Sequence, residues 1–178
     1  MSKKNQSLRG MVYASMFGAL TAVGAYIIIP LPPVPITLQT LFVILAGALL
    51  GGKLGALSQI VYILLGIIGL PVFAGGKAGA GVLLGPTGGY LVGFVIGAYV
   101  VGKLTAVREK PGFIWLLCSM LAGIAVLYLL GVIQLMAVAK LDLSKALAVG
   151  VLPPLPGDIL KIVIAALVVP KIRDHLRL

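Results

Sequence analysis

Acidic residues are scarce in this chain. Its 178 residues include 4 Asp and Glu against 14 Lys and Arg, and charged residues make up 10% of the total. An ordinary soluble domain is about a quarter charged and roughly half apolar. Here 61% of residues are hydrophobic and the mean hydropathy is +1.19. Folding buries only about 70% of the surface of a chain this size, so the excess of apolar surface predicts a single domain embedded in lipid.

Cysteine and histidine are almost missing. Cys118 and His175 are the single examples, which excludes an intramolecular disulfide and any site built from several thiolates or imidazoles. No Ser–His pair or P-loop motif is present, so we expect neither an enzyme nor a chain that hydrolyses ATP alone. No metal or other cofactor is expected.

The basic residues do not suggest nucleic-acid binding. They lie at the chain ends and in short gaps between apolar runs, whereas a nucleic-acid surface needs a basic face or stripe. Gaps between membrane segments are where topology places positive charge. The polar N-terminus is followed by an apolar run too long for a cleavable signal peptide, so no cleavage is expected.

The apolar runs predict an all-α integral membrane protein, a bundle with six transmembrane helices. Pro and Gly punctuate the runs, and a helix needs about 20 apolar residues to span a bilayer. Two of the runs are shorter than this, which is tolerated where neighbouring protein covers their ends. The expected spans are residues 11–29, 38–50, 54–70, 82–101, 113–139 and 158–169.

Six spans would place both termini on one side of the membrane. Most cations outside the spans then share that side, which the positive-inside rule makes cytoplasmic in the plasma membrane. The expected inner cations are Lys3, Lys4, Arg9, Lys53, Lys103, Arg108, Lys110, Lys171, Arg173 and Arg177, and the expected outer ones are Lys77, Lys140 and Lys145. The outer connections are rich in Pro and Gly, as loops that cover a binding site often are.

Asp158 and Lys161 form the most informative pair. Asp158 is the acidic residue that touches a predicted membrane segment, and Lys161 follows three positions later. Ionisable groups in a membrane are costly and indicate function, and a spacing of three places both on one helix face. Two interpretations stay open: the pair binds a polar ligand, or Asp158 caps its helix while Lys161 pairs with it or extends to the surface.

Other polar or flexible residues are predicted near the same outer end. Thr37 and Gln39 open the second span, where they either cap it or bind a ligand. Lys77 is the lone charge of a glycine-rich connection. Tyr90 offers a ring and a hydroxyl, either to a ligand or as an anchor at the membrane interface.

Small residues recur every four positions in the first span, at Ala14, Gly18 and Ala22. Such a stripe allows another helix to approach closely. The neighbour is either a helix of this chain or a separate membrane subunit.

Four motifs together resemble the BioY family, the biotin-specific substrate-binding subunits of energy-coupling factor (ECF) transporters. They are residues 34–41 (VPITLQTL), 70–75 (LPVFAG), 84–90 (LGPTGGY) and 155–161 (LPGDILK), and they occur in the expected order over most of the chain. The resemblance implies a six-helix subunit that takes up biotin from the extracellular side, with Asp158 and Lys161 as ligand contacts. It also implies that the stripe on the first span meets a transmembrane coupling subunit, which recruits two ATPase subunits.

Biotin suits the remaining residues. Asp158 would accept from the ureido N–H groups, while Lys161 or Gln39 would serve the carbonyl. The apolar body would lie against Phe73 and Tyr90. The resemblance implies that the glycine-rich loop, with Gly75 and Gly76, covers the pocket, and Lys77 is a candidate partner for the biotin carboxylate. Another vitamin or small hydrophilic compound is the alternative cargo.

Overall fold

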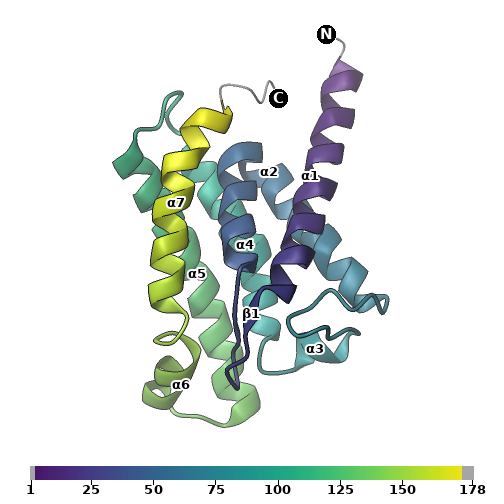
Figure 1. Cartoon of the computed structure of the whole chain (residues 1–178), viewed down its shortest axis with the longest axis vertical. Helices are drawn as coiled ribbons and strands as arrows, with labels where there is room; N and C mark the ends of the chain where they lie inside the picture. Colours follow the sequence, from purple (N-terminus) through teal and green to yellow (C-terminus); the bar gives the residue numbers. More distant parts are fainter. Residues whose placement is uncertain (1–2, 174–178) are drawn as a thin grey trace.

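The apolar runs fold as helices in the computed structural model of the chain, which describes residues 3–173, with side chains from residue 8 onward. His175 and Arg177, named above, lie outside the described residues. Long helices form a bundle, and loops, a short hairpin and two short helices gather at one end (Figure 1). The elements are α1 (Lys3–Tyr26), β1 (Ile28–Ile29), β2 (Ile36–Thr37), α2 (Gln39–Ile67), α3 (Gly81–Leu84), α4 (Gly88–Thr105), α5 (Phe113–Ala139), α6 (Leu143–Gly150) and α7 (Leu155–Arg173).

Helix α2 is broken at Gly51 into two arms. Gly51 has φ 80° and ψ 172°, a backbone conformation that glycine adopts without a steric cost. The arms fold back on each other (Figure 1), and a Cβ added to Gly55 would lie 2.8 Å from the Cα of Gly47. The two arms correspond to the helical hairpin expected over residues 38–50 and 54–70.

Several helix ends differ from those expected. The fourth span, expected over residues 82–101, begins instead as the separate short helix α3, and α4 runs from Gly88 to Thr105. Helix α1 ends at Tyr26, and the next residues form strand β1, which pairs antiparallel with β2 through Ile28–Thr37 and Ile29–Ile36. The chain forms paired strands there rather than a continued helix, because the prolines between the strands exclude a helix. Helix α7 continues through Pro170 to Arg173, although the proline predicted its end, whereas α5 has the predicted bounds.

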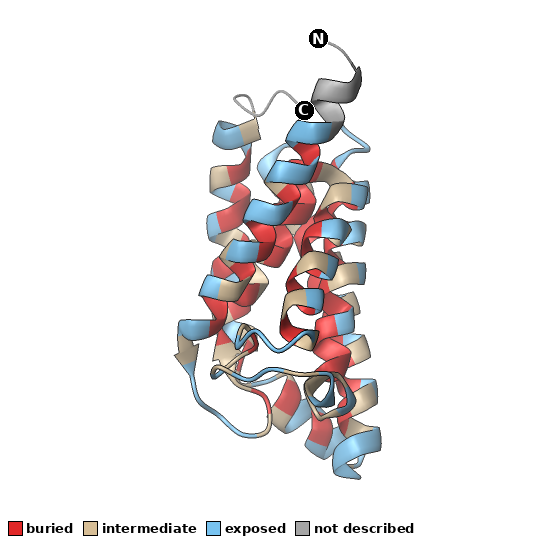
Figure 2. Cartoon of the chain, turned by 90° about the vertical axis from the view of Figure 1, so that its right-hand side faces the viewer, coloured by how far each residue is buried: buried red, intermediate tan, exposed pale blue. Residues whose placement is uncertain are grey.

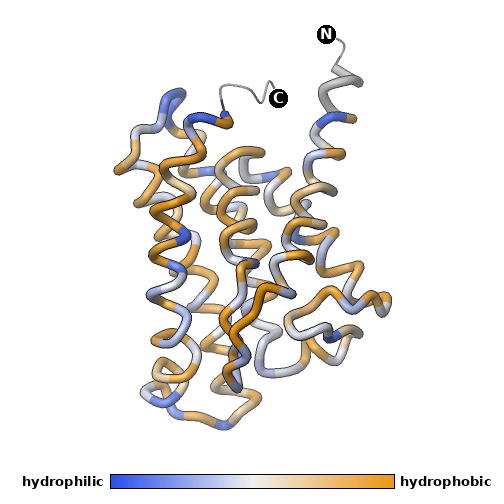
Figure 3. Tube along the Cα trace, in the orientation of Figure 1, coloured by the Kyte–Doolittle hydropathy of each residue, from blue (hydrophilic) through white to orange (hydrophobic). Residues whose placement is uncertain are grey.

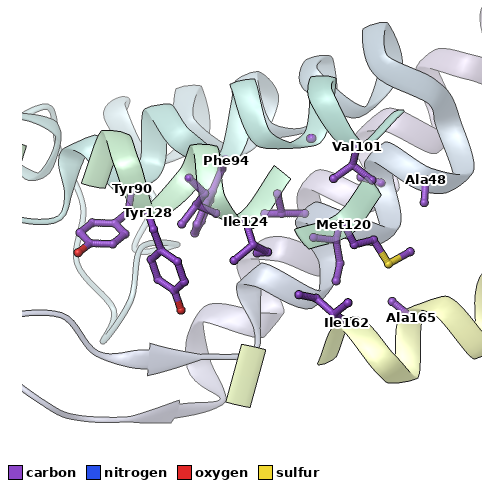
Figure 4. Close-up of a cluster of buried hydrophobic side chains, with 14 of the residues drawn as sticks. Ala48, Tyr90, Phe94, Val101, Met120, Ile124, Tyr128, Ile162 and Ala165 are labelled. Atoms are coloured by element: carbon purple, nitrogen blue, oxygen red, sulfur yellow. The ribbon is translucent and has the colours of Figure 1, made fainter. Parts of the chain in front are cut away.

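Close helix packing holds the bundle together. Helix α2 packs against α1 and α4, α4 packs against α5, and α7 lies against α2 and α5. Small residues make the approach close: a Cβ added to Gly97 of α4 would lie 2.9 Å from the carbonyl oxygen of Gly123 on α5, as is typical of helices packed in lipid. Buried side chains from α4, α5 and α7 meet in the core (Figure 4), while each helix keeps an exposed outer face (Figure 2).

The stripe on α1 faces inward. Ala14 is 1% exposed, Gly18 is buried and Ala22 is half-buried. A Cβ at Gly18 would lie 2.9 Å from the carbonyl oxygen of Ser58 on the second arm of α2. The stripe therefore serves packing within the chain, and its contact with another subunit stays a prediction.

Hydrophobic residues predominate along the traces of the long helices (Figure 3). Large aliphatic residues on these helices are exposed, as a lipid-embedded chain requires, among them Leu129, Ile133, Ile164 and Leu167. Within residues 3–173, α2, α4 and α5 are each long and apolar enough to cross a membrane, and α6 with α7, bent by 54°, makes a fourth candidate if it counts as one span. The all-helical class is confirmed, while six spans remain a prediction.

Candidate functional site

A cavity opens at the loop end of the bundle. The β1–β2 hairpin, the loop before α3, and the first turns of α2, α4 and α7 surround it, and α5 forms its back wall. Its open space, counted together with the mouth and the adjoining solvent, is about 700 Å³. The lining residues are Val34, Pro35, Thr37, Gln39, Thr40, Phe73, Ala74, Lys77, Val82, Thr87, Tyr90, Leu91, Phe94, Leu127, Tyr128, Pro154, Asp158 and Lys161.

Asp158 and Lys161 form a buried ion pair in the cavity wall. Lys161 Nζ lies 2.7 Å from Asp158 Oδ1. The residues are 2% and 8% exposed, respectively. Both lie in the first turns of α7 and share one face of that helix, as their spacing predicted. This face is buried in the bundle. Burying such a pair is costly unless further hydrogen bonds compensate its lost hydration.

Those further bonds come from α2, α5 and the hairpin. Asp158 Oδ1 also accepts from Thr40 Oγ1 at 2.6 Å, and Oδ2 accepts from the Tyr128 hydroxyl at 2.5 Å. Lys161 Nζ donates to the Thr37 carbonyl oxygen at 2.6 Å and to Thr40 Oγ1 at 2.9 Å. The three hydrogens of the ammonium therefore all have acceptors.

The structural interpretation of this pair holds in one part and fails in the other: Lys161 pairs with Asp158, but Asp158 does not cap its helix. Its carboxylate binds side chains of two other helices and of Lys161, and no described backbone N–H group donates to it. A carboxylate oxygen has room for about two donors. Oδ1 accepts from Thr40 and Lys161, whereas Oδ2 accepts from Tyr128 alone among the described residues, so Oδ2 keeps one further acceptor position.

Thr37 and Gln39 belong to a second polar chain in the same wall. Thr37 Oγ1 accepts from the Gln39 backbone N–H at 3.3 Å and donates to Gln39 Oε1 at 2.9 Å. Gln39 Nε2 donates to the Tyr62 hydroxyl at 2.5 Å, which donates to the Val72 carbonyl oxygen at 3.1 Å. Thr37 thus acts locally at the start of α2 and also lines the cavity. The second hydrogen of the Gln39 amide has no described acceptor.

The glycine-rich loop forms a small turn over the cavity. Phe73 pairs with Lys77 through an isolated β-bridge, with the Phe73 N–H donating to the Lys77 carbonyl oxygen at 3.0 Å. Gly75 and Gly76, both with φ 73°, form the turn that joins Phe73 to Lys77. These two glycines are not among the lining residues, whereas Phe73 and Lys77 are. Phe73 is buried against the Tyr62 ring and Lys77 is exposed at the mouth.

Aromatic rings form part of the cavity wall. Tyr90 and Tyr128 meet edge to face, with ring centroids 6.5 Å apart (Figure 4). The Tyr90 hydroxyl donates to the Gly150 carbonyl oxygen at 3.0 Å, so this buried residue is part of the core rather than an anchor at the membrane interface. Phe94 lies beside them in the lining.

Sequence reasoning missed Thr40, Tyr128 and Phe94. Thr40 adjoins Gln39 at the start of α2, and Tyr128 is a polar side chain within the very apolar α5, so both carried a weak signal. Phe94 carried none, because an aromatic residue in a membrane helix is ordinary. All the residues that the sequence did predict as ligand contacts, apart from Gly75 and Gly76, line this one cavity.

A lipid-facing helical bundle with a polar cluster inside an otherwise apolar cavity is a membrane protein that binds a small molecule. The chain belongs to the BioY family, whose model matches residues 1–178. Among its relatives, the biotin transporter BioY of Thermotoga maritima is 48% identical over 166 residues, covering 93% of this chain and 96% of the relative. A probable biotin transporter BioY of Pyrococcus horikoshii is 42% identical, covering 90% and 94%.

A crystal structure of the S-component for biotin from an ECF-type ABC transporter has the same fold. It is 31% identical in sequence, covers 98% of this chain and 95% of its own chain, and gives a TM-score of 0.86. The family assignment expected from the four motifs is therefore confirmed.

Proposed function

We propose that this chain is the membrane subunit that captures biotin for uptake, without changing it chemically. The observation that carries the proposal is the fixed carboxylate of Asp158, buried in the cavity wall with one acceptor position left on Oδ2. Relatives named as biotin transporters and a structural neighbour described as a biotin S-component support this choice of ligand.

The ureido ring of biotin matches the polar wall. Its N–H groups are donors, so one of them meets the free position on Asp158 Oδ2. Its carbonyl is an acceptor and meets the unpaired amide hydrogen of Gln39. Lys161 holds the carboxylate in place and reaches the ligand only by giving up one of its three present bonds.

The remainder of biotin matches the rest of the cavity. Its sulfur-containing ring and valeryl chain are apolar and lie between Phe73, Tyr90 and Phe94. Its carboxylate lies toward the mouth, where Lys77 is the exposed cation. The turn at Gly75 and Gly76 carries both Phe73 and Lys77 and so covers the site.

The charge distribution supports an orientation with six spans and both termini in the cytoplasm. The loops around the cavity then face the outside, and the end with most cations faces inward. The chain has no ATP-binding motif. We infer that an ECF transmembrane coupling subunit and two ATPase subunits energise transport, as the ECF-type neighbour suggests.

Biotin titration of the purified protein in detergent, with Asp158→Asn, tests the proposal. Loss of a hydrogen bond to a charged group costs about 1.5–3 kcal/mol, so affinity should fall roughly ten- to hundredfold. Asp142→Asn is the matched control, because Asp142 is an exposed carboxylate that caps α6 away from the cavity.

Competition distinguishes biotin from other cargoes. Unlabelled biotin should displace bound biotin, while other water-soluble vitamins should not. Failure of biotin to bind, with saturable binding of a different vitamin, would replace the proposed ligand. Equal affinity of Asp158→Asn and the wild-type protein would remove the assigned role of Asp158.

A further inference from the structure

A second cavity lies at the opposite end of the bundle. The connection between α4 and α5 and the end of α7 form it, on the side where α1 begins and α7 ends (Figure 1). Its lining residues are Glu109, Lys110, Pro111, Val169, Pro170 and Arg173, and its open space, with the adjoining solvent counted, is about 600 Å³. The biotin cavity shares none of these residues.

The charges around this second cavity favour an anion. Lys110 and Arg173 line it against one carboxylate, Glu109. Arg173 Nη1 is buried and has no hydrogen-bond partner among the described residues. A planar guanidinium with free N–H groups is well suited to phosphate oxygens. Arg108, adjacent in sequence, adds positive charge and is held over the Trp115 ring, 4.3 Å from its centroid.

The apolar surroundings favour an anion that carries acyl chains. Ile114 is 75% exposed and Val107 68% exposed, and Phe113 beside them is exposed as well. Trp115 donates its indole N–H to the Leu104 carbonyl oxygen at 2.9 Å, an amphipathic placement typical of the headgroup level of a bilayer. A water-soluble anion would gain nothing from these residues, whereas a lipid would cover them.

We propose that the second cavity binds the headgroup of an anionic phospholipid. Lys110 and Arg173 contact its phosphate, and its acyl chains descend along Phe113 and Ile114. In the proposed orientation this end faces the cytoplasmic leaflet, where anionic lipids attract basic residues near the membrane surface. The cations at this end thus form one defined lipid site in addition to their effect on topology.

The test is lipid titration of the full-length protein in detergent, followed by native mass spectrometry. The lipids are phosphatidylglycerol and, as the neutral comparison, phosphatidylcholine. The double variant Lys110→Gln/Arg173→Gln removes both cations of the cavity and should weaken phosphatidylglycerol binding by roughly 10- to 30-fold. The matched control Lys53→Gln/Lys103→Gln removes two cations from the same end but outside the cavity, and should change binding less than twofold.

Biotin titration of every variant shows that the fold is retained, because the two cavities share no residue. Equal weakening in both double variants would overturn the proposal, since the effect would then be general surface charge. Phosphatidylcholine binding as tightly as phosphatidylglycerol would also overturn it, as would displacement of the lipid by millimolar inorganic phosphate, which indicates a site for a free anion. Unchanged lipid binding, with loss of co-purifying transport subunits, would assign the cavity to a protein contact instead.

Discussion

Removing one partner of the buried ion pair should harm both stability and binding, whereas removing both should harm binding alone. Asp158→Asn leaves the Lys161 ammonium buried with two neutral acceptors, the Thr37 carbonyl and the Thr40 hydroxyl. Lys161→Met leaves the carboxylate with two hydroxyl donors, from Thr40 and Tyr128. The double variant Asp158→Asn/Lys161→Met has no charge in this wall.

The size of the effect follows from the burial of the pair. Breaking a buried pair by removing one partner typically costs about 3–5 kcal/mol, while replacing both members with neutral groups is often nearly neutral. Asp158→Asn should therefore lower the free energy of unfolding by about 3 kcal/mol. This is the lower end of the range, because Thr37 and Thr40 still accept hydrogen bonds from the buried ammonium. The double variant should recover most of that loss. Its biotin affinity should stay low, because the acceptor on Oδ2 is changed in both variants.

Thermal unfolding in detergent and biotin titration measure the two quantities separately. The wild-type protein and the double variant should unfold at similar temperatures, with Asp158→Asn well below both. The reasoning is refuted if the double variant is no more stable than Asp158→Asn, or if it binds biotin as tightly as the wild-type protein. The first result would show that the charges are not coupled, and the second that the carboxylate does not meet the ligand.

Three further substitutions test separate parts of the cavity. Tyr128→Phe deletes the hydroxyl that holds Asp158, so stability should fall by about 1.5–3 kcal/mol in thermal unfolding and biotin affinity should fall with it; unchanged stability would contradict the hydrogen bond. Lys77→Gln should weaken biotin binding about two- to fivefold, as an exposed ion pair implies, but leave the binding of biotin amide unchanged; equal losses for both ligands would exclude a carboxylate contact. Gly66→Ala adds a methyl group against the Phe73 ring. The overpacking should cost about 1–3 kcal/mol of stability in thermal unfolding, and biotin affinity should fall because the ring is displaced; full affinity would show that Phe73 is not a wall of the site.

The sequence predicted the helices best where composition alone decides them. Helix α5 has the expected bounds because its run is long, very apolar and free of proline. Helix α1 ends early because strand pairing of Ile28 and Ile29 depends on residues nine and seven positions away, which periodicity within a run does not report. Helix α7 continues past Pro170 because proline, which has no backbone N–H, removes only one helical hydrogen bond. Pro170 lies in the last turn of α7, where the loss of that bond costs little.

The candidate site was predictable where charge is conspicuous in an apolar chain. Asp158 and Lys161 stand out in a membrane segment because ionisable groups there are expensive. Their partners do not stand out: Thr40 and Tyr128 are ordinary residues whose role comes from the packing of α2 and α5 against α7. Gly75 and Gly76 were conspicuous for the opposite reason, as turn formers that place their neighbours rather than line the cavity themselves.

Stability alone is a poor reason for a buried ion pair, because apolar residues of similar size would hold the helices equally well or better. A pair that served only packing would be expected to have its acceptors filled, since each open position on a buried carboxylate forgoes a hydrogen bond. Lys161 meets that expectation, with all three hydrogens bonded. Asp158 does not, because Oδ2 accepts from Tyr128 alone among the described residues and the carboxylate lines a cavity. This incomplete half is the reason why we propose Asp158, rather than Lys161, as the member of the pair that binds the ligand.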